Sequence, residues 1–346
     1  MAFNMKREGS LLHPFWPEAR WNISGLFNYR PLVNFLVQTM RAHGLTHVLE
    51  SFHDAPDLAW NGGRVNANVP LHPDTATYMQ TLNRMGIGVY MTFTNAILEK
   101  KHLDDRASNE LLDQLDEQCG LNGVIVLNDL LADYIRQRKP GLKQICSVVK
   151  AFIENPRGDI DWYRRMQERF DRVVVHTDHM FDRDLLDQLD RDRAEILITE
   201  ECIYQCPNRA RHQTLNSIYN IAQFEDPEKA KATMQEIKDI RENRCAGGGR
   251  ILDLERNPRG LRSCYLNHDE VKKIYDMGFR HLKISGRRKT LYGMAWNILN
   301  WVFNQDQAYI FARIIYSSID QKTRTDYTRL AREKGLIPPA PAGRQG

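Results

Sequence analysis

Eight short runs rich in apolar and β-branched residues recur along the chain, and amphipathic stretches separate them. This alternation predicts parallel strands joined by crossover helices, in a sheet covered on both faces. Eight such units favour a closed (β/α)₈ TIM-type barrel over an open sheet. The expected strands are 22–26, 46–52, 88–94, 123–127, 142–149, 172–176, 195–199 and 281–284. The expected helices include 31–43, 72–85, 111–118, 159–170 and 182–190.

The interval between the seventh and eighth expected strands is long enough to be an insertion, at about 202–280. It holds Gly247-Gly248-Gly249, which cannot lie inside a stable helix. Residues 292–318, rich in Trp, Phe and Ile, are expected to form one or two closing helices. These features predict one barrel domain over 1–334, and the Pro-rich segment 335–346 is predicted to be a disordered tail.

Composition excludes some classes of protein and leaves others open. The 346 residues are 42% hydrophobic with a net charge of +4, which supports a full core but does not by itself indicate nucleic acid. No apolar run approaches the ~20 residues of a membrane span, and the N-terminus lacks the long apolar stretch of a signal peptide. We therefore expect a cytoplasmic protein with reduced thiols and no membrane span.

Four cysteines point to a metal site. Cys202 and Cys206 follow the seventh expected strand, and Cys245 and Cys264 follow in the insertion. Thiolates select iron–sulfur clusters, zinc or copper(I). One C-x₃-C pair with two remote cysteines fits a four-iron cluster better than zinc, which usually uses C-x₂-C and stays the alternative. The plainer interpretation is four small buried hydrophobic residues.

The remaining cysteines and a residue shortly after Cys206 bear on that ligand set. Cys119 and Cys146 are expected to be structural, with Cys146 as the reserve ligand. The radical S-adenosylmethionine pattern is disfavoured, because Arg209 stands where its third cysteine would be.

A basic cluster follows the eighth expected strand. Lys283 lies within that strand, and Gly286-Arg287-Arg288-Lys289 comes directly after it. Cations at a helix start oppose the helix dipole unless an anion is bound, and guanidinium groups suit carboxylate or phosphate. Lys283, Arg287 and Arg288 are therefore predicted to bind a small anionic co-substrate; the alternative is a solvated helix start.

The segment 282–292, Leu-Lys-Ile-Ser-Gly-Arg-Arg-Lys-Thr-Leu-Tyr, resembles the Lys-Ile-Glu-Gly-Arg-x-Lys-(Ser/Thr)-x-x-Tyr signature of the collagenase-like peptidase family U-32. Segments 265–271, 123–130 and 138–142 also resemble that family, over about residues 40–300 in all. The chain departs from the pattern at Ser285, where the family has glutamate, and in the sequence around Cys202 and Cys206.

The resemblance implies an iron–sulfur cluster on four cysteines and oxygen-independent hydroxylation, as family members carry out on ubiquinone precursors or RNA bases with prephenate as the suspected oxygen donor. It thus predicts an oxidoreductase acting on an aromatic or nucleobase substrate. The alternatives are a U-32-type peptidase and a non-catalytic, cluster-bearing subunit of a heteromeric complex. Neither a Gly-x-Ser-x-Gly elbow nor a His-Glu-x-x-His helix occurs.

Catalytic candidates are Arg287, which matches the family's arginine, and polar residues expected at strand ends, where barrels place their chemistry. The strand-end candidates are Glu50, Asn128 and Asp129. Nucleic acid as a substrate and homo- or hetero-oligomeric assembly are left open by the sequence.

Overall fold

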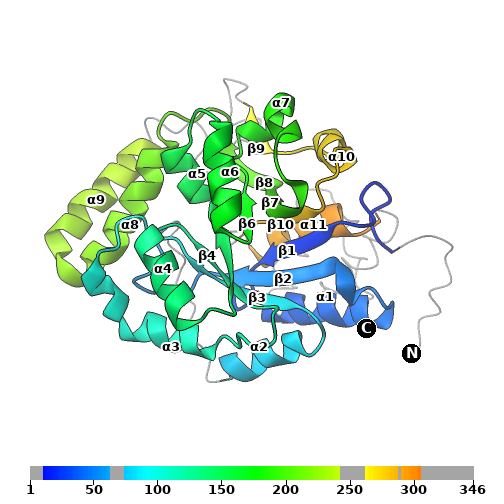
Figure 1. The fold of residues 1–346 in the computed structure, drawn as a ribbon, viewed down its shortest axis with the longest axis horizontal. Helices are drawn as coiled ribbons and strands as arrows, with labels where there is room; N and C mark the ends of the chain where they lie inside the picture. The colour runs from blue at the N-terminus through cyan, green and yellow to red at the C-terminus, as the bar shows by residue number, and fades with distance from the viewer. Residues whose placement is uncertain (1–10, 63–73, 242–261, 287–289, 305–346) are drawn as a thin grey trace, which may run out of the picture. The chain divides into compact units, whose positions relative to one another are not determined.

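The computed structural model describes residues 11–62, 74–241, 262–286 and 290–304. Eight strands close into a barrel in the order β1-β10-β7-β6-β5-β4-β3-β2, and every neighbouring pair is parallel (Figure 1). The predicted (β/α)₈ barrel is confirmed. Its strands are β1 (Arg20–Ser24), β2 (Leu49–Asp54), β3 (Gly88–Phe93), β4 (Gly123–Val126), β5 (Lys143–Cys146), β6 (Arg172–Val174), β7 (Ala194–Leu197) and β10 (His281–Ile284).

Helices follow the strands around the barrel (Figure 1). Most begin at a side-chain cap that satisfies a free backbone N–H, as at Asp105, Asn128, Ser147, Asp159 and Asp182. The helices that connect β1 to β7 are α1 (Arg30–Ala42), α2 (Thr75–Asn83), α3 (Arg106–Gln114), α4 (Asp129–Arg138), α5 (Val148–Glu154), α6 (Ile160–Arg169) and α7 (Arg183–Asp187).

The strand bounds differ by a few residues from those that the sequence pattern predicts, and two of the differences have a clear local cause. The 46–52 run begins with a 3₁₀ helix, η1 (Thr46–Val48), so that β2 starts only at Leu49. The 142–149 run stops at Cys146, because the Ser147 side chain accepts a hydrogen bond from Val149 N and starts α5.

The inside of the barrel holds an apolar cluster and a charged network. Tyr90, Ile125, Ile145, Val174 and Leu197 form the buried apolar cluster, from β3 to β7. The polar and charged side chains of the network come from β1, β2, β6, β7 and β10, and they are described below with the candidate site.

The chain leaves the barrel after β7 and returns at β10. In between, β8 (Thr199–Ile203) pairs antiparallel with β9 (Ser263–Tyr265). Helices α8 (Arg209–Glu225) and α9 (Pro227–Asp239) pack together, and α10 (His268–Asp276) leads back to β10. Helix α8 also covers the loops after β2 and β3, since Asn220 Nδ2 donates to Leu58 O at 2.9 Å and Ala96 N donates to Ser217 Oγ at 3.0 Å.

Residues 11–14 and 290–304 belong to a second compact unit. Its helix α11 (Leu291–Val302) begins at the Thr290 cap, and His13 N donates to Val302 O at 3.0 Å. This helix covers the first part of the predicted 292–318 segment; the rest, and the predicted tail 335–346, lie outside the described residues. None of the described helices is both long and apolar enough to cross a membrane.

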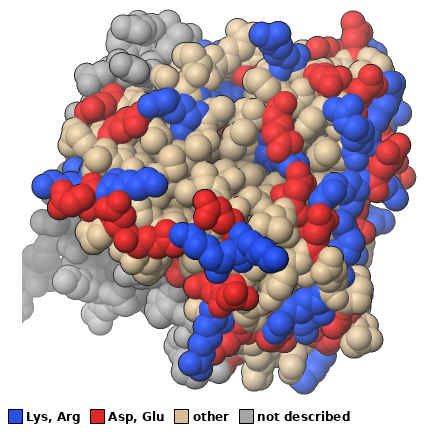
Figure 2. Space-filling model, turned by 60° about the vertical axis from the view of Figure 1, so that its left-hand side comes forward, with Lys and Arg blue, Asp and Glu red and all other residues tan. Residues whose placement is uncertain are grey.

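Acidic and basic side chains are interspersed on the surface. On the face that Figure 2 shows, Lys and Arg lie beside Asp and Glu. The surface of the protein carries ion pairs such as Arg138 with Asp113 at 2.7 Å and Arg169 with Asp133 at 2.7 Å. Such pairing provides solubility but contributes little stability at exposed positions.

Candidate functional site: a cysteine cluster around Arg209

The pairing of β8 with β9 places three cysteines in one region, beyond the carboxyl end of β7. Cys202 lies in β8, Cys206 follows it, and Cys264 lies in β9. Gln205, with φ of 53°, is in the left-handed region, and the turn that it makes allows the Cys206 side chain to hydrogen-bond with Cys202. None of the five described cysteines forms a disulfide.

Arg209 is the centre of this region. Its Nη1 lies 2.8 Å from Asp178 Oδ2 and its Nη2 lies 2.9 Å from Asp178 Oδ1, a bidentate pair. The same Nη2 lies 3.3 Å from Cys264 Sγ and also donates to the Ile203 carbonyl. Because Arg209 is only 5% exposed, these contacts are largely shielded from water.

Asp178 provides the other charge of the site. Cys264 Sγ lies 3.3 Å from Asp178 Oδ1, so the thiol donates to a carboxylate that Arg209 already holds. Burial opposes the charge of Asp178, but the hydrogen bonds and charge of Arg209 prevail and lower its pKa.

The thiols themselves are held in the neutral form. The hydrogen bond between Cys202 and Cys206, together with burial, raises the pKa of the Cys202 thiol. Burial raises the pKa of the Cys264 thiol as well, despite the nearby guanidinium of Arg209. A metal would displace these protons, because the thiolate is the metal-binding form.

Two buried histidines lie behind the cysteine cluster. The rings of His176 and His179 stack with centroids 4.2 Å apart, and Tyr163 Oη lies 3.0 Å from His179 Nδ1. Burial and the neighbouring His179 lower the pKa of His176 to about 3, and burial lowers the pKa of His179. Both rings are therefore neutral at pH 7.

Within the part of the chain that the structure describes, the cysteines make pairwise contacts and form no single-ion site. Among the described residues, no three His, Cys, Asp or Glu side chains converge on a point that could hold one metal ion, as a zinc site requires. Cys206 bonds to Cys202, and the charge of Arg209 acts on both Cys202 and Cys264. Cys245, the fourth predicted ligand, lies outside the described residues. Cys146 ends β5, is fully buried and has a raised pKa because of that burial.

A second group of charged residues lies inside the barrel; it joins the predicted site residues Lys283 and Glu50 to Glu195 and Arg172, which the sequence did not indicate. Glu195 in β7 is fully buried and accepts from Lys283 Nζ at 2.8 Å and Asn22 Nδ2 at 3.0 Å. Arg172 Nη1 lies 3.4 Å from the same carboxylate. Asn22 Oδ1 is in turn 2.6 Å from His53 Nδ1. Lys283, predicted to bind an anionic ligand, is thus held by a protein carboxylate, and its ligand-binding role stays a prediction.

Glu50 belongs to this interior network. It accepts from Arg172 Nη2 at 2.6 Å, and its Oε2 lies 2.8 Å from His281 Nδ1. Burial works against ionisation, but the bonds and charges of His281 and Arg172 lower the pKa of Glu50 to about 2. The expectation that Glu50 follows its strand is wrong: it is the second residue of β2, near the amino end of that strand.

Asn128 and Asp129 lie after β4, as predicted, but both side chains serve local structure. Asn128 Oδ1 accepts from Leu131 N and its Nδ2 donates to Leu98 O, so it caps α4 and holds the preceding loop. Asp129 accepts from Lys150 Nζ at 2.9 Å and pairs with Arg169 at 3.4 Å. Their catalytic roles stay predictions.

The predicted anion site can be followed only as far as Gly286, since Arg287 and Arg288 lie outside the described residues. Ser285 N donates to Thr199 Oγ1 at 2.8 Å, which joins the exit of β10 to the start of β8. The segment that leads to the two arginines therefore leaves the barrel beside the strand that carries Cys202.

No family model matches the chain, and no curated protein matches it. Among solved structures, that of the U32 peptidase Mk0906 is similar over 81% of this chain and 96% of that chain, with 14% sequence identity and a TM-score of 0.44.

Proposed function

We propose that this chain is an iron–sulfur-dependent barrel enzyme of the U-32 type, which hydroxylates an aromatic or nucleobase substrate without molecular oxygen. The observation that carries the proposal is the grouping of three thiols beyond the carboxyl ends of the barrel strands: Cys206 bonds to Cys202, and Arg209 acts on both Cys202 and Cys264. Barrel enzymes place their active sites at this end. Thiols are weak hydrogen-bond partners, so their convergence contributes little stability and is better explained by a shared ligand.

The three described cysteines would hold the cluster, with Cys245 as the expected fourth ligand. When bound, the cluster would supply a one-electron redox centre. Arg209 would keep Asp178 and Cys264 in place through the bonds described above, and its charge favours thiolate over thiol. The neutral His176 and His179 rings close the site from behind and exclude water. An anionic oxygen donor such as prephenate would bind at Arg287 and Arg288, as the resemblance implies.

The metal content of anaerobically purified protein tests the proposal. We expect about four iron and four sulfide per chain, with visible absorbance and an EPR signal after reduction. Cys202→Ala, Cys206→Ala and Cys264→Ala should each lose most of the iron. Cys119→Ala is the matched control and should keep it, because Cys119 lies between α3 and β4, near the amino ends of the strands. A colourless wild-type protein without iron would overturn the proposal.

The reaction needs a separate test. The iron-loaded protein is incubated anaerobically with prephenate and either phenolic quinone precursors or RNA, and products are screened by mass spectrometry for one added oxygen atom. Product that disappears with Cys202→Ala supports the hydroxylase. A zinc-loaded, iron-free protein that cleaves gelatin would indicate the U-32-type peptidase, and product formed only with a partner protein would indicate a subunit of a complex.

A further inference from the structure

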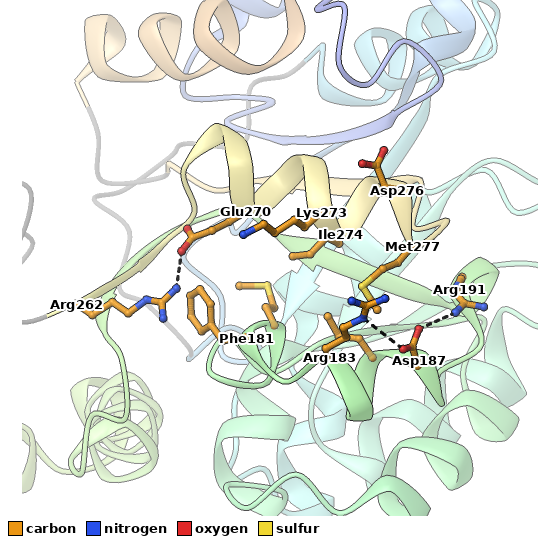
Figure 3. A pocket seen from close by; sticks show the side chains of 12 residues that line it. Phe181, Arg183, Asp187, Arg191, Arg262, Glu270, Lys273, Ile274, Asp276 and Met277 are labelled. Carbon is orange, nitrogen blue, oxygen red and sulfur yellow. Dashed lines mark hydrogen bonds and ion pairs between the residues drawn. The ribbon is translucent and has the colours of Figure 1, made fainter.

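A groove of about 680 Å³ lies on the outside of the barrel, between α7 and α10 (Figure 3). One face of α10 borders it, with Glu270, Lys273, Ile274 and Met277 at helical spacing. The groove is there because α7 has only five residues and is about 7.5 Å long, too short to cover the nine residues of α10. Its volume is in the range of sites for small molecules.

The groove has an aromatic wall that is fixed in place. The guanidinium carbon of Arg262 lies 3.7 Å from the centroid of the Phe181 ring, and the Tyr204 ring contacts Phe181 edge-on at 5.3 Å. Met180 and Met277 also line the groove. Thioether sulfur and aromatic rings contact a flat aromatic ligand favourably, so this wall suits a ring better than an aliphatic chain.

The charges of the groove are unbalanced toward positive. Arg262 is paired with Glu270, while Arg183 and Arg191 share Asp187 at 3.7 and 3.2 Å (Figure 3). Asp276 is bound by Lys272, and within the described ranges Lys273 has no ion-pair partner. An anion in the groove would therefore meet one cation without a carboxylate partner, Lys273, and two arginines that share a single carboxylate.

Arg191 is also fixed at this groove. Its side chain lies on Gly278, where a Cβ would be 3.0 Å from Arg191 Cδ, so a larger residue would push it away. Its Nε is enclosed and has no hydrogen-bond partner in the described parts of the chain. Arg191 is thus held at the edge of the groove, where it shares the Asp187 carboxylate with Arg183.

We propose that this groove binds a small aromatic carboxylate, with its ring against Phe181 and the two methionines and its carboxylate at Lys273 and Arg191. The site is distinct from the cysteine cluster, although Tyr204, which contacts Phe181, lies in the loop between Cys202 and Cys206. The proposal does not depend on a bound cluster.

Calorimetric titration of the full chain with phenylacetate tests it, with phenylacetamide as the neutral probe of the same shape. We expect saturable binding of phenylacetate, and weaker binding of the amide. Lys273→Gln should weaken phenylacetate binding roughly three- to tenfold and leave the amide unchanged, because only the acid loses an ion pair. Lys273→Glu should abolish binding of the acid.

Lys273 is exposed, so these substitutions should not disturb folding. Lys238→Gln, on the exposed face of α9, is the matched control and should bind like the wild type. The proposal is overturned if phenylacetate gives no saturable heat up to about 10 mM, if Lys273→Glu binds it as tightly as the wild type, or if the amide binds as well as the acid.

Discussion

Arg172 and Arg209 are both buried, yet their surroundings differ in kind. Arg172, at the start of β6, contacts the carboxylates of Glu50 and Glu195, and Glu195 also binds Lys283. Two cations and two carboxylates therefore balance inside the barrel. Arg209, at the start of α8, has one carboxylate, Asp178; its other partners are a carbonyl and a thiol.

The difference separates a structural network from a reactive site. Inside the barrel, strong donors meet strong acceptors, and an added ligand would have to break an existing ion pair. Around Arg209, the neutral thiols of Cys202 and Cys264 bond weakly and can give up their protons to a metal. We therefore assign rigidity of the barrel to the first region and chemistry to the second.

The largest expected loss of stability follows a substitution in the charged network inside the barrel. Glu195→Ala leaves Lys283 and Arg172 with one buried carboxylate fewer, and breaking a buried pair in this way costs about 3–5 kcal/mol. Urea denaturation measures the free energy of unfolding. Glu110→Ala, which removes an exposed partner of Arg106, is the control and should change it by less than about 1 kcal/mol. Equal effects of the two substitutions would show that the network adds no stability.

Arg209→Lys tests the second region. Lysine keeps the charge but loses the bidentate bond to Asp178 and the contact with Cys264, and we expect a loss of about 1.5–3 kcal/mol together with lower iron content. Arg211→Lys, two residues along the same helix and paired with Glu236 on the surface, should change neither quantity. If Arg209→Lys keeps full iron content, Arg209 has no part in holding the cysteines.

The two regions should also lose their contributions to stability at different pH values. The pKa of His176 is lowered from 6.5 to about 3 in the fold, so the unfolded chain takes up the proton first and stability falls as the pH drops below 6.5. The pKa of Glu50 falls from 4.5 to about 2, so its contribution is complete above pH 4.5 and is lost only below that value.

Between pH 7 and pH 5 we thus expect the free energy of unfolding to fall by about 2 kcal/mol because of His176. Urea midpoints at several pH values, for the wild type and His176→Gln, measure it. The variant should show a flatter dependence between pH 6.5 and 5, whereas Glu50→Gln should not alter the slope in that range. A wild-type stability that stays constant down to pH 5 would contradict the lowered pKa of His176.

The sequence predicted what depends on local pattern. All eight barrel strands were identified, because each is a short β-branched run, and strand order then placed Cys202 beyond β7. Errors of two or three residues at strand ends had large consequences: the true start of β2 at Leu49 moves Glu50 from the expected exit of the strand to its entrance.

Contacts across the barrel could not be predicted in this way. The pairing of Glu50 in β2 with Arg172 in β6 depends on strands that are not neighbours, and Glu195 and Lys283 stand in runs that are otherwise apolar. In the sequence, Arg209 stands out only because the radical S-adenosylmethionine pattern would have a cysteine at that position. Its contact with Asp178, 31 residues away, needs the folded loop after β6.

The smallest effect is expected at Asp129, which belongs to neither region. Asp129→Asn removes one of two carboxylates that bind Lys150, but Glu154 Oε1 remains 2.6 Å from Lys150 Nζ and the Asp129 side chain is 53% exposed. The free energy of unfolding should therefore fall by less than about 1 kcal/mol. Iron content and turnover should also remain, because the Asp129 carboxylate pairs with Lys150 of α5 and Arg169 of α6, away from the cysteine cluster. Urea denaturation, iron analysis and the hydroxylation assay measure the three quantities on one preparation.

Loss of turnover in Asp129→Asn, with stability and iron content unchanged, would instead indicate that Asp129 is a catalytic residue. The active site would then extend around the barrel rim from the cysteines to the end of β4.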